Sequence, residues 1–270
     1  MSRPGRVPST QSERKAIAAA FMEADVAQCY AARPPYAPEL YDCLLRHVVG
    51  RRRALDLGCG QGKIAVVLAD HFAEVFALDP SAAMIEAGKA ADARRHGTIA
   101  WICESAEVYH SDAIFDLVTA GTSIHWLDHT VVFPKLAEWT TTFAVITGDA
   151  PAFAPCGDDA WVAFLTRWLA RVGRQYDPVQ AAAEANRHEV WMDIAGREEF
   201  AYTFRQSVGD FIISQHSRAT WSRMVMGELL ATEFDRELND LMQPFATDGQ
   251  LELAMVSYLT WGAPRRMSRA

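Results

Sequence analysis

The chain has 270 residues and a formal net charge of −8, and half of its residues are hydrophobic while 22% are charged. A disordered chain combines low hydrophobicity with high charge, and a protein that binds double-stranded nucleic acid usually has a basic surplus. The composition therefore argues against both classes. The length suits one α/β domain, with or without a cap.

The five cysteines are widely spaced and form no CxxC pair, which argues against a disulfide framework and against a structural zinc site. No apolar stretch reaches the roughly 18–20 residues that a membrane span needs, and the apolar segment 16–21 is too short for a signal peptide. We therefore expect a soluble, cytoplasmic protein with a loose N-terminus, no membrane partner and no nucleic-acid partner.

Helices are expected over residues 16–30 and 39–49, and Arg33-Pro34-Pro35-Tyr36 separates them because each proline restricts the residue before it. Strands and helices then alternate. The predicted strands are 53–57, 75–79, 99–103, 115–120 and 143–147, and the predicted helices are 64–72 and 81–91. Ser81 is the expected N-cap of the second helix. This alternation predicts a parallel sheet with helices on both faces, which binds ligands at the carboxyl ends of its strands.

The second half of the chain lacks this alternation. An amphipathic helix is expected over 159–172, a strand over 199–208, mostly helix over 211–241 and a last strand over 252–260. We interpret residues 1–270 as a single domain with four parts. These are an N-terminal cap region (1–40), a cofactor-binding core (41–150), a substrate-side insert of helices and sheet (151–245) and the segment of the final strand (246–270).

The most informative segment is the glycine-rich turn Gly58-Cys59-Gly60-Gln61-Gly62, which follows the first strand and precedes a helix. Glycine allows a sharp backbone turn and the close approach of a ligand. Asp79 lies 21 residues after Gly58, at the end of the second strand, where a carboxylate can accept hydrogen bonds from both hydroxyls of a ribose. The alternative is a tight strand–helix turn that Asp79 only caps.

Two details argue against a dinucleotide cofactor. The glycine spacing is GxGxG instead of GxGxxG, and Asp56 at the end of the first strand would repel a pyrophosphate but suit an ammonium group. A ligand that combines a ribose with a positively charged amino group is S-adenosylmethionine (SAM). The pattern therefore predicts SAM as the cofactor and S-adenosylhomocysteine as its product.

Asp56-x-Gly58-x-Gly60-x-Gly62, Asp79 and Phe115-Asp116-Leu117-Val118 together resemble the class I SAM-dependent methyltransferases. This resemblance implies an α/β fold with a Rossmann-like, seven-stranded methyltransferase sheet and a helical cap or insert. Within the class, a second set of motifs is similar to the small-molecule branch that includes trans-aconitate methyltransferases. These motifs are Tyr30…Arg33-Pro34…Tyr36, Ser105-Ala106-Glu107 and His125-Trp126-Leu127-Asp128.

The similarity covers about residues 25–150. The family often has a Pro-Gly-Gly turn before its fifth strand, whereas this chain has Leu136-Ala137-Glu138-Trp139-Thr140-Thr141-Thr142. This departure leaves the start of the fifth strand open but does not affect the residues expected at the cofactor.

The resemblance implies cofactor-binding roles along the whole of SAM. The residues are Asp56, Gly58, Cys59 and Gly60 at the methionine part, Asp79 at the ribose, Pro80, Met84, Ser105, Ala106 and Glu107 at the adenine, Gly121 and Thr122 at the methyl-donor end, and Tyr30 and Arg33 in a segment that closes over the cofactor. Arg33 is the expected partner of the SAM carboxylate.

Methyl transfer from a sulfonium is an in-line displacement that requires two aligned molecules and the exclusion of water. His125 is expected just beyond the fourth strand, close to the sulfonium, and histidine, with an ordinary pKa of about 6.5, can accept a proton near neutral pH. The alternative is that His125 bonds the backbone and shapes its loop. Trp126, His129 and His216 are expected on the substrate side.

His216 is also a second candidate base, with a polar cluster on a helix surface as the alternative. His125 and His129 are four residues apart, as in helical metal pairs, but a loop is expected at His125 and no metal site is predicted.

The leading hypothesis is a SAM-dependent methyltransferase that acts on an N or O atom of a small metabolite, as a monomer or homodimer. The resemblance suggests a carboxylate acceptor, which needs no base, whereas an amine, for example on an amino sugar, would use one. A non-catalytic SAM-binding regulator is an alternative, and the glycine spacing disfavours a nicotinamide-dependent oxidoreductase. Thr119-Ala120-Gly121-Thr122 stands where methyltransferases of nucleic-acid bases have an Asn-Pro-Pro-Tyr type motif.

Overall fold

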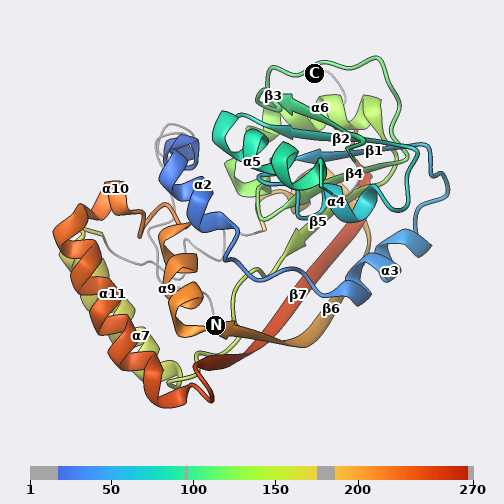
Figure 1. The fold of residues 1–270 in the computed structure, drawn as a ribbon. Coiled ribbons are helices and arrows are strands. Elements are labelled where there is room, and N and C mark those ends of the chain that lie inside the picture. The colour runs from blue at the N-terminus through green and yellow to red at the C-terminus, as the bar shows by residue number, and fades with distance from the viewer. Residues whose placement is uncertain (1–17, 95–96, 175–185, 267–270) are drawn as a thin grey trace. The chain divides into compact units, whose positions relative to one another are not determined.

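The structure is a computed structural model that describes residues 18–94, 97–174 and 186–266 (Figure 1). The chain divides into two compact units, each of which gathers three segments. We call them the sheet unit (Pro35–Gly148, Arg187–Phe200 and Ser257–Ala270) and the helical unit (Met1–Pro34, Asp149–Asn186 and Ala201–Val256). The expected loose N-terminus lies outside the described residues.

The strands are β1 (Arg53–Leu57), β2 (Glu74–Asp79), β3 (Ile99–Cys103), β4 (Leu117–Gly121), β5 (Phe143–Thr147), β6 (Met192–Ser207) and β7 (Gln250–Pro264). The α-helices are α2 (Ala24–Tyr30), α3 (Pro38–Arg46), α4 (Ala65–Leu68), α5 (Ala82–Asp92), α6 (His129–Trp139), α7 (Asp158–Arg171), α9 (Val208–His216), α10 (Arg223–Met226) and α11 (Glu228–Met242). Short 3-10 helices are η1 (Ala19–Met22), η2 (Ile124–Trp126), η3 (Glu189–Trp191) and η4 (Gln243–Phe245).

The strands form one seven-stranded sheet in the order β3-β2-β1-β4-β5-β7-β6, which confirms the predicted α/β fold class. The first five strands of this order pair in parallel, and β7 pairs antiparallel with β5. The direction of the strand order changes between β1 and β4. The chain first adds β2 and β3 on one side of β1 and then returns to add β4 and β5 on its other side. Ligands bind beyond the carboxyl ends of the strands at such a switch point.

The core of the sheet unit explains why the central strands could be predicted. Leu55, Leu57, Val118 and Phe143 are fully buried and pack with Phe133 of α6 in one cluster. A central parallel strand is buried on both faces, so it appears in the sequence as a short, continuous apolar run. The strands predicted at 53–57, 99–103 and 143–147 are confirmed with the predicted bounds, including the start of β5.

The helices differ more from the predicted ranges. Ser81 caps α5 as predicted, since its Oγ accepts a hydrogen bond from the Met84 N–H. The helix predicted at 64–72 is only the single turn α4, and the helix predicted at 16–30 is interrupted at Glu23, which is extended. The first two residues of that predicted helix are not among the described residues.

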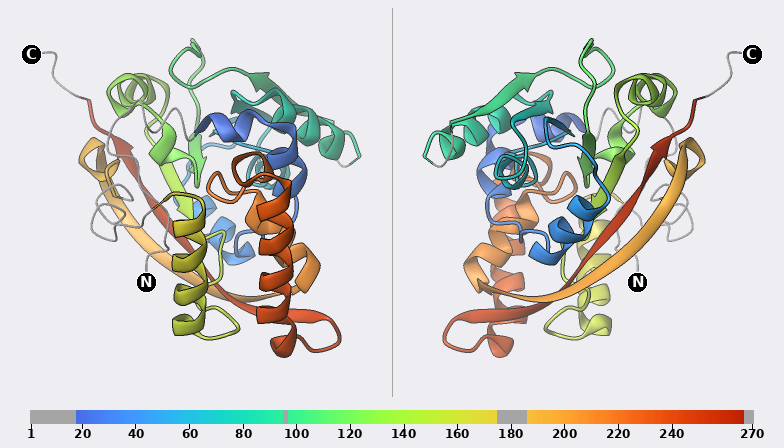
Figure 2. Two further views of the ribbon diagram at one scale, coloured as in Figure 1. Left: turned by 90° about the vertical axis from the view of Figure 1, so that its left-hand side faces the viewer. Right: turned by 90° about the vertical axis from the view of Figure 1, so that its right-hand side faces the viewer.

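β6 and β7 are much longer than the predicted strands 199–208 and 252–260. Both are long, curved strands (Figure 2). Gly196 belongs to the early part of β6, and a Cβ there would lie 2.3 Å from the ring of Trp261 on β7. This close backbone–ring packing requires glycine, a residue whose presence weakens a strand signal in the sequence.

The helical unit has its own core. Trp168 of α7, Phe211 of α9 and Phe234 of α11 are buried together with Leu251 and Leu253 of β7. α7 and α11 lie side by side (Figure 2), and an ion pair of 2.6 Å between Arg167 and Glu237 joins them. The helix predicted at 159–172 and the helical character of 211–241 are confirmed, with a break at 217–222.

The compact units interleave along the chain, whereas the predicted parts 41–150 and 151–245 are contiguous. The description of residues 1–270 as a single methyltransferase domain stays a prediction. Within the described ranges, no helix combines the length and the apolar composition required to span a membrane.

We expect Phe234→Ala to destabilise the protein by about 3–5 kcal/mol, because it opens a cavity at a fully buried position. The ring centroids of Trp168, Phe164 and Trp221 lie 5.2–5.4 Å from that of Phe234. Urea unfolding measures the loss. The control is Leu229→Ala on the same helix, at a side chain that is 76% exposed, which should cost less than about 0.5 kcal/mol. Equal losses for the two variants would contradict this packing.

Candidate functional site

The turn after β1 fastens three strand ends of the sheet unit. Gly58 and Gly60 have φ angles of +60° and +55°, a region that is unfavourable for residues with a side chain. The Cys59 N–H donates to the Leu78 carbonyl of β2 at 3.0 Å, and Ser123 Oγ, just beyond β4, donates to the Leu57 carbonyl at 2.7 Å. A Cβ on Gly58 would lie 2.6 Å from Cβ of Ser123, so this turn requires glycine.

Asp79 is held by two backbone donors. Its Oδ2 accepts from the Gly60 N–H and its Oδ1 from the Ser81 N–H, both at 2.8 Å. The side chain is largely buried, and this burial raises the pKa of Asp79 while the two N–H bonds act in the opposite direction. These contacts orient the carboxylate at the carboxyl ends of β1 and β2.

Asp56 is more deeply buried, with only 1% of its surface exposed. Its Oδ1 accepts from the Thr119 hydroxyl at 2.8 Å, and among the described residues its Oδ2 has no hydrogen-bond partner. Burial raises the pKa of Asp56 to about 7, although the Thr119 hydroxyl and the Ala65 backbone lower it. An acceptor that is buried without a partner is costly. A ligand donor or cation would therefore be favourable beside Oδ2.

Cys59, within this turn, and Met84, on α5, are buried, whereas Pro80 is exposed. Burial raises the pKa of the Cys59 thiol well above its ordinary value, and the carboxyl groups of Asp56 and Asp79 raise it further. The group is therefore a neutral thiol and a small packing residue at this turn, not an activated nucleophile.

The segment Ser105-Ala106-Glu107 is fixed by contacts that sequence reasoning missed. Lys135 of α6 donates from Nζ to the carbonyls of Glu107 (2.6 Å) and Tyr109 (2.9 Å). Glu107 in turn accepts from the Asp128 N–H at 2.9 Å, so its carboxylate holds the start of α6. One signal in the sequence marks this role: Lys135 is the single lysine or arginine between residues 96 and 166.

A second missed pair is Tyr36 and Thr122. Thr122 follows β4 with a φ angle of +50°, which is strained for a β-branched residue. Its Oγ1 lies 2.8 Å from the Tyr36 hydroxyl, and its N–H donates to the Ile146 carbonyl. Strained residues of this kind cluster at functional sites. Tyr36 belongs to the motif of the N-terminal segment, but the sequence alone indicated no role for it.

His125 and Trp126 belong to η2, which begins three residues after the end of β4, and their rings lie 4.4 Å apart at a tilted angle. Arg187 supports this loop from the other side, since its Nη2 lies 3.3 Å from both the His125 and the Leu127 carbonyl. The His125 side chain is half-buried. The structure thus has His125 in the expected loop, and its role as a base stays a prediction.

His129 begins α6 and is 2% exposed. Its Nε2 lies 2.8 Å from the Ile124 carbonyl, and its ring packs edge-on against Phe133. These contacts fix η2 against α6. The expected role of His129 in substrate binding stays a prediction, and the observed contacts are structural.

Tyr30 and Arg33 lie in the helical unit. The Arg33 guanidinium stacks over the Tyr30 ring at 4.4 Å and forms a buried ion pair of 2.8 Å with Asp149. Its Nε and Nη2 donate to Oγ and the carbonyl of Ser217 at 2.7 and 2.6 Å. Arg33 therefore already has a carboxylate partner within its own unit, and its predicted pairing with SAM stays a prediction.

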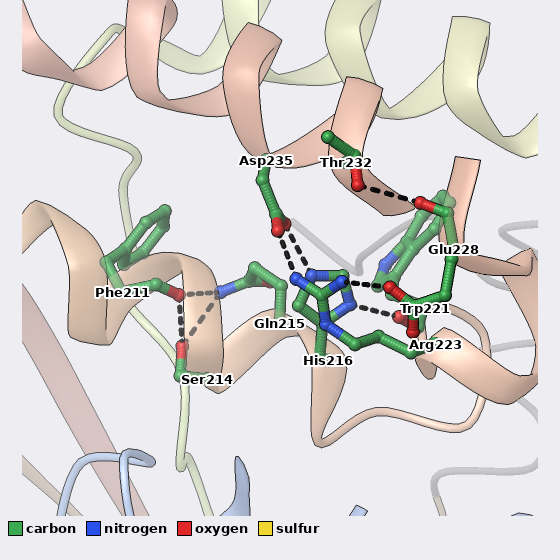
Figure 3. Close-up of polar contacts among 9 residues, drawn as sticks. All are labelled: Phe211, Ser214, Gln215, His216, Trp221, Arg223, Glu228, Thr232 and Asp235. Carbon is green, nitrogen blue, oxygen red and sulfur yellow. Dashed lines mark hydrogen bonds and ion pairs between the residues drawn. The ribbon is translucent and has the colours of Figure 1, made fainter. Parts of the chain in front are cut away.

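His216 ends α9 and is 2% exposed, so it is not on a helix surface. Its Nδ1 lies 2.6 Å from the Trp221 carbonyl and its Nε2 2.5 Å from Oδ1 of Asp235, which also pairs with Arg223 (Figure 3). Both ring nitrogens are therefore within hydrogen-bond distance of oxygens of the helical unit itself. His216 thus has no ring nitrogen directed at a substrate, which weighs against a role as base.

The structure therefore brings together the predicted residues of the glycine turn, Asp56 and Asp79, in the sheet unit. Tyr30, Arg33 and His216 lie in the helical unit, in two separately bonded polar clusters. Among the described residues, no group of three or more potential metal ligands occurs.

Residues 54–142 match a protein-family model described as a methyltransferase domain. An uncharacterized methyltransferase of Mycobacterium tuberculosis is 34% identical over 106 residues, which are 39% of this chain and 42% of that protein. A trans-aconitate 2-methyltransferase of Methylobacterium radiotolerans is 36% identical over 88 residues, 32% of either chain. The chain thus spans less than half the length of these curated relatives.

A solved structure from Anaeromyxobacter dehalogenans, provisionally assigned as a type II methyltransferase, is similar in fold with a TM-score of 0.63. The two proteins are 21% identical, and the similarity covers 86% of this chain and 99% of that one. This similarity confirms the predicted Rossmann-like methyltransferase fold.

We expect Asp56 to make the ligand-free protein less stable as the pH rises from about 4 to 7. The folded state keeps the proton of Asp56 up to about pH 7, whereas the unfolded chain releases it near the ordinary value of 3.8. Folding therefore binds a proton in this window, and the free energy of unfolding falls by up to about 1.4 kcal/mol per pH unit. Asp56→Asn should remove this fall, as measured by urea unfolding at several pH values.

The matched control is Asp112→Asn, at an exposed carboxyl group of the same unit. It should leave the pH profile of stability unchanged. Parallel profiles for the wild type and Asp56→Asn would show that Asp56 ionises as easily in the folded state as in the unfolded one.

Proposed function

We propose that the chain is a SAM-dependent methyltransferase that moves a methyl group from SAM to an N or O atom of a small metabolite. The observation that supports this most is Asp56, a buried carboxyl group with an unpartnered oxygen beside a glycine turn. The ammonium group of SAM would stabilise the ionised form of this carboxyl group, whereas a phosphate beside it would not. The methyltransferase family model on residues 54–142 supports the same cofactor.

Asp79 fits the ribose of this cofactor. Each of its oxygens accepts one backbone N–H, from Gly60 or from Ser81, and a carboxylate oxygen can accept two hydrogen bonds. Both oxygens therefore retain capacity for a ribose hydroxyl. The backbone bonds also keep the carboxylate oriented before a ligand arrives.

Bound SAM supplies an electrophilic methyl group on a sulfonium. The chain has to align the acceptor, exclude water and, for an N–H or O–H acceptor, take up a proton. We assign proton uptake to the imidazole of His125, three residues after Thr122. Tyr36 holds Thr122 through the 2.8 Å hydroxyl contact and so keeps the start of this loop in place.

The assignment of His125 distinguishes classes of methyl acceptor but does not identify one compound. The relative named as a trans-aconitate 2-methyltransferase favours a carboxylate, which needs no base, and an amine or alcohol would use His125. A regulator that binds SAM without methylating any acceptor is the alternative of another class. Radiolabelled SAM with a panel of acids, phenols and amines separates these cases.

We expect Asp79→Ala to weaken binding of S-adenosylhomocysteine roughly 10- to 100-fold, because it removes charge-assisted hydrogen bonds to the ribose. Isothermal titration calorimetry measures the affinity, and circular dichroism checks the fold of the variant. Asp112→Ala, at an exposed carboxylate, is the control and should bind like the wild type. If the wild type gives no heat with SAM or S-adenosylhomocysteine, the proposed function is wrong.

We expect His125→Ala to lower kcat roughly 100-fold or more for amine or alcohol acceptors, which lose a general base, and only a few-fold for carboxylates. Initial rates with both acceptor classes test this. His110→Ala, at an exposed histidine of the same unit, should leave both rates unchanged. Equal losses for both acceptor classes would show that His125 positions the acceptor and does not accept its proton.

A further inference from the structure

Thr119 is a polar residue in the middle of β4, and the proposed function gives it no role. β4 otherwise consists of apolar residues and glycine, and the Thr119 side chain is fully buried in the sheet unit. A buried hydroxyl is unfavourable unless it makes a hydrogen bond. The partner of this hydroxyl therefore indicates what the residue does.

The hydroxyl of Thr119 has a carboxylate as its partner. β1 and β4 pair in parallel with Asp56 opposite Thr119. Oγ1 of Thr119 lies 2.8 Å from Oδ1 of Asp56 and 3.5 Å from the Leu55 carbonyl. A hydroxyl has one proton, and 2.8 Å is the ordinary length of an O–H···O hydrogen bond, whereas 3.5 Å is longer than such bonds usually are. The hydroxyl thus bonds the carboxylate in preference to the backbone.

This bond has two effects on Asp56. It occupies Oδ1, and Oδ2, which has no hydrogen-bond partner among the described residues, is left for a ligand donor. It also favours the ionised form, because a hydrogen bond to a carboxylate is roughly twice as strong as one to a neutral carboxyl group. Burial raises the pKa of Asp56 to about 7, and the Thr119 hydroxyl acts against this rise.

Other groups around Asp56 act on it from the neighbouring elements. Asp79, at the end of β2, raises the pKa of Asp56, and the backbone of Ala65, at the start of α4, lowers it. Cys59, in the turn, is a neutral thiol whose own pKa Asp56 raises. Among these groups, the Thr119 hydroxyl is the side chain that stabilises the charged carboxylate.

We propose that Thr119 is a positioning residue for the cofactor, since its hydroxyl holds the Asp56 carboxylate ionised and oriented to take the ammonium group of SAM. The proposal rests on the proposed function, and it adds that the affinity for the cofactor depends on pH. A proton competes with the ammonium group for Asp56, so the affinity falls as the pH drops below about 7. A site without the hydroxyl needs a higher pH to reach the same affinity.

The test compares Thr119→Val, which removes the hydroxyl, with Thr119→Ser, which keeps it. The control is Thr140→Val, at another buried threonine of the sheet unit, whose hydroxyl donates to the Thr142 carbonyl at 3.1 Å. Calorimetry at about pH 6 and about pH 8 measures the binding of two ligands. These are S-adenosylhomocysteine and methylthioadenosine, which has the adenosine part but lacks the amino-acid part. Protonation of Asp79 affects the ribose of both ligands, whereas Asp56 affects only the first.

We expect the wild type to bind S-adenosylhomocysteine about tenfold more weakly at pH 6 than at pH 8, since a group with a pKa of about 7 is mostly protonated at the lower pH. Thr119→Val should bind it about five- to tenfold more weakly than the wild type at pH 6 and at most about twofold more weakly at pH 8. Thr119→Ser and Thr140→Val should follow the wild type. All variants should bind methylthioadenosine alike.

Three results would overturn the proposal. These are equal affinities of the wild type and Thr119→Val for S-adenosylhomocysteine at pH 6, a loss of the same size at both pH values, or an equal loss for methylthioadenosine. The last two are expected of a merely structural residue. If circular dichroism shows that Thr119→Val does not fold, Thr119→Ala takes its place, with the same expected and contradicting results.

The proposed function and the role of Thr119 fail in different ways. If the wild type gives no heat with either ligand at either pH, the proposed function is wrong, and the role of Thr119 is wrong with it. If the wild type binds S-adenosylhomocysteine and the variant without the hydroxyl has the same pH profile, only the role of Thr119 is wrong.

Discussion

The turn after β1 is the constraint on which the sheet unit depends. It reverses the chain in left-handed conformations at Gly58 and Gly60, and the space above Gly58 is already taken by Ser123. The same few residues bond β1 to β2 and to the loop after β4. A side chain at Gly58 would therefore move three strand ends at once. Asp56 and Asp79 extend from these strand ends. The positions of their carboxyl groups are therefore set mainly by the backbone of the turn.

The two units handle buried charge in different ways. In the helical unit, the buried guanidinium of Arg33 pairs with Asp149, and the half-buried carboxylate of Asp235 contacts both His216 and Arg223. In the sheet unit, Asp56 is buried with a neutral hydroxyl as its side-chain partner. Paired charges stabilise or specify a fold, whereas an incompletely bonded buried group points to a ligand. By this criterion Asp56 stands apart among the buried carboxyl groups of the described residues, since one of its oxygens has no hydrogen-bond partner there.

Sequence reasoning succeeded where the determinants are local. β5 has the predicted bounds because a strand that is buried on both faces is a largely continuous apolar run. The early part of β6 was missed because it carries charges and Gly196, whose fit against Trp261 depends on a distant strand. At the site, the glycine turn, Asp56 and Asp79 could be predicted from spacing along consecutive elements. The partners of Arg33 could not, since Asp149 and Ser217 lie more than a hundred residues from it along the chain.

The pairing of β5 with β7 has a consequence for the synthesis of this protein on the ribosome. Residues 143–147 find their antiparallel neighbour only at 258–262, more than a hundred residues further along the chain. Until that stretch is translated, β5 is an unprotected edge strand with buried-type side chains such as Phe143 and Val145, a surface that invites pairing with other nascent chains. A ribosome that stalls before the last strand would therefore leave an aggregation-prone sheet, even though every residue of the glycine turn has already been made.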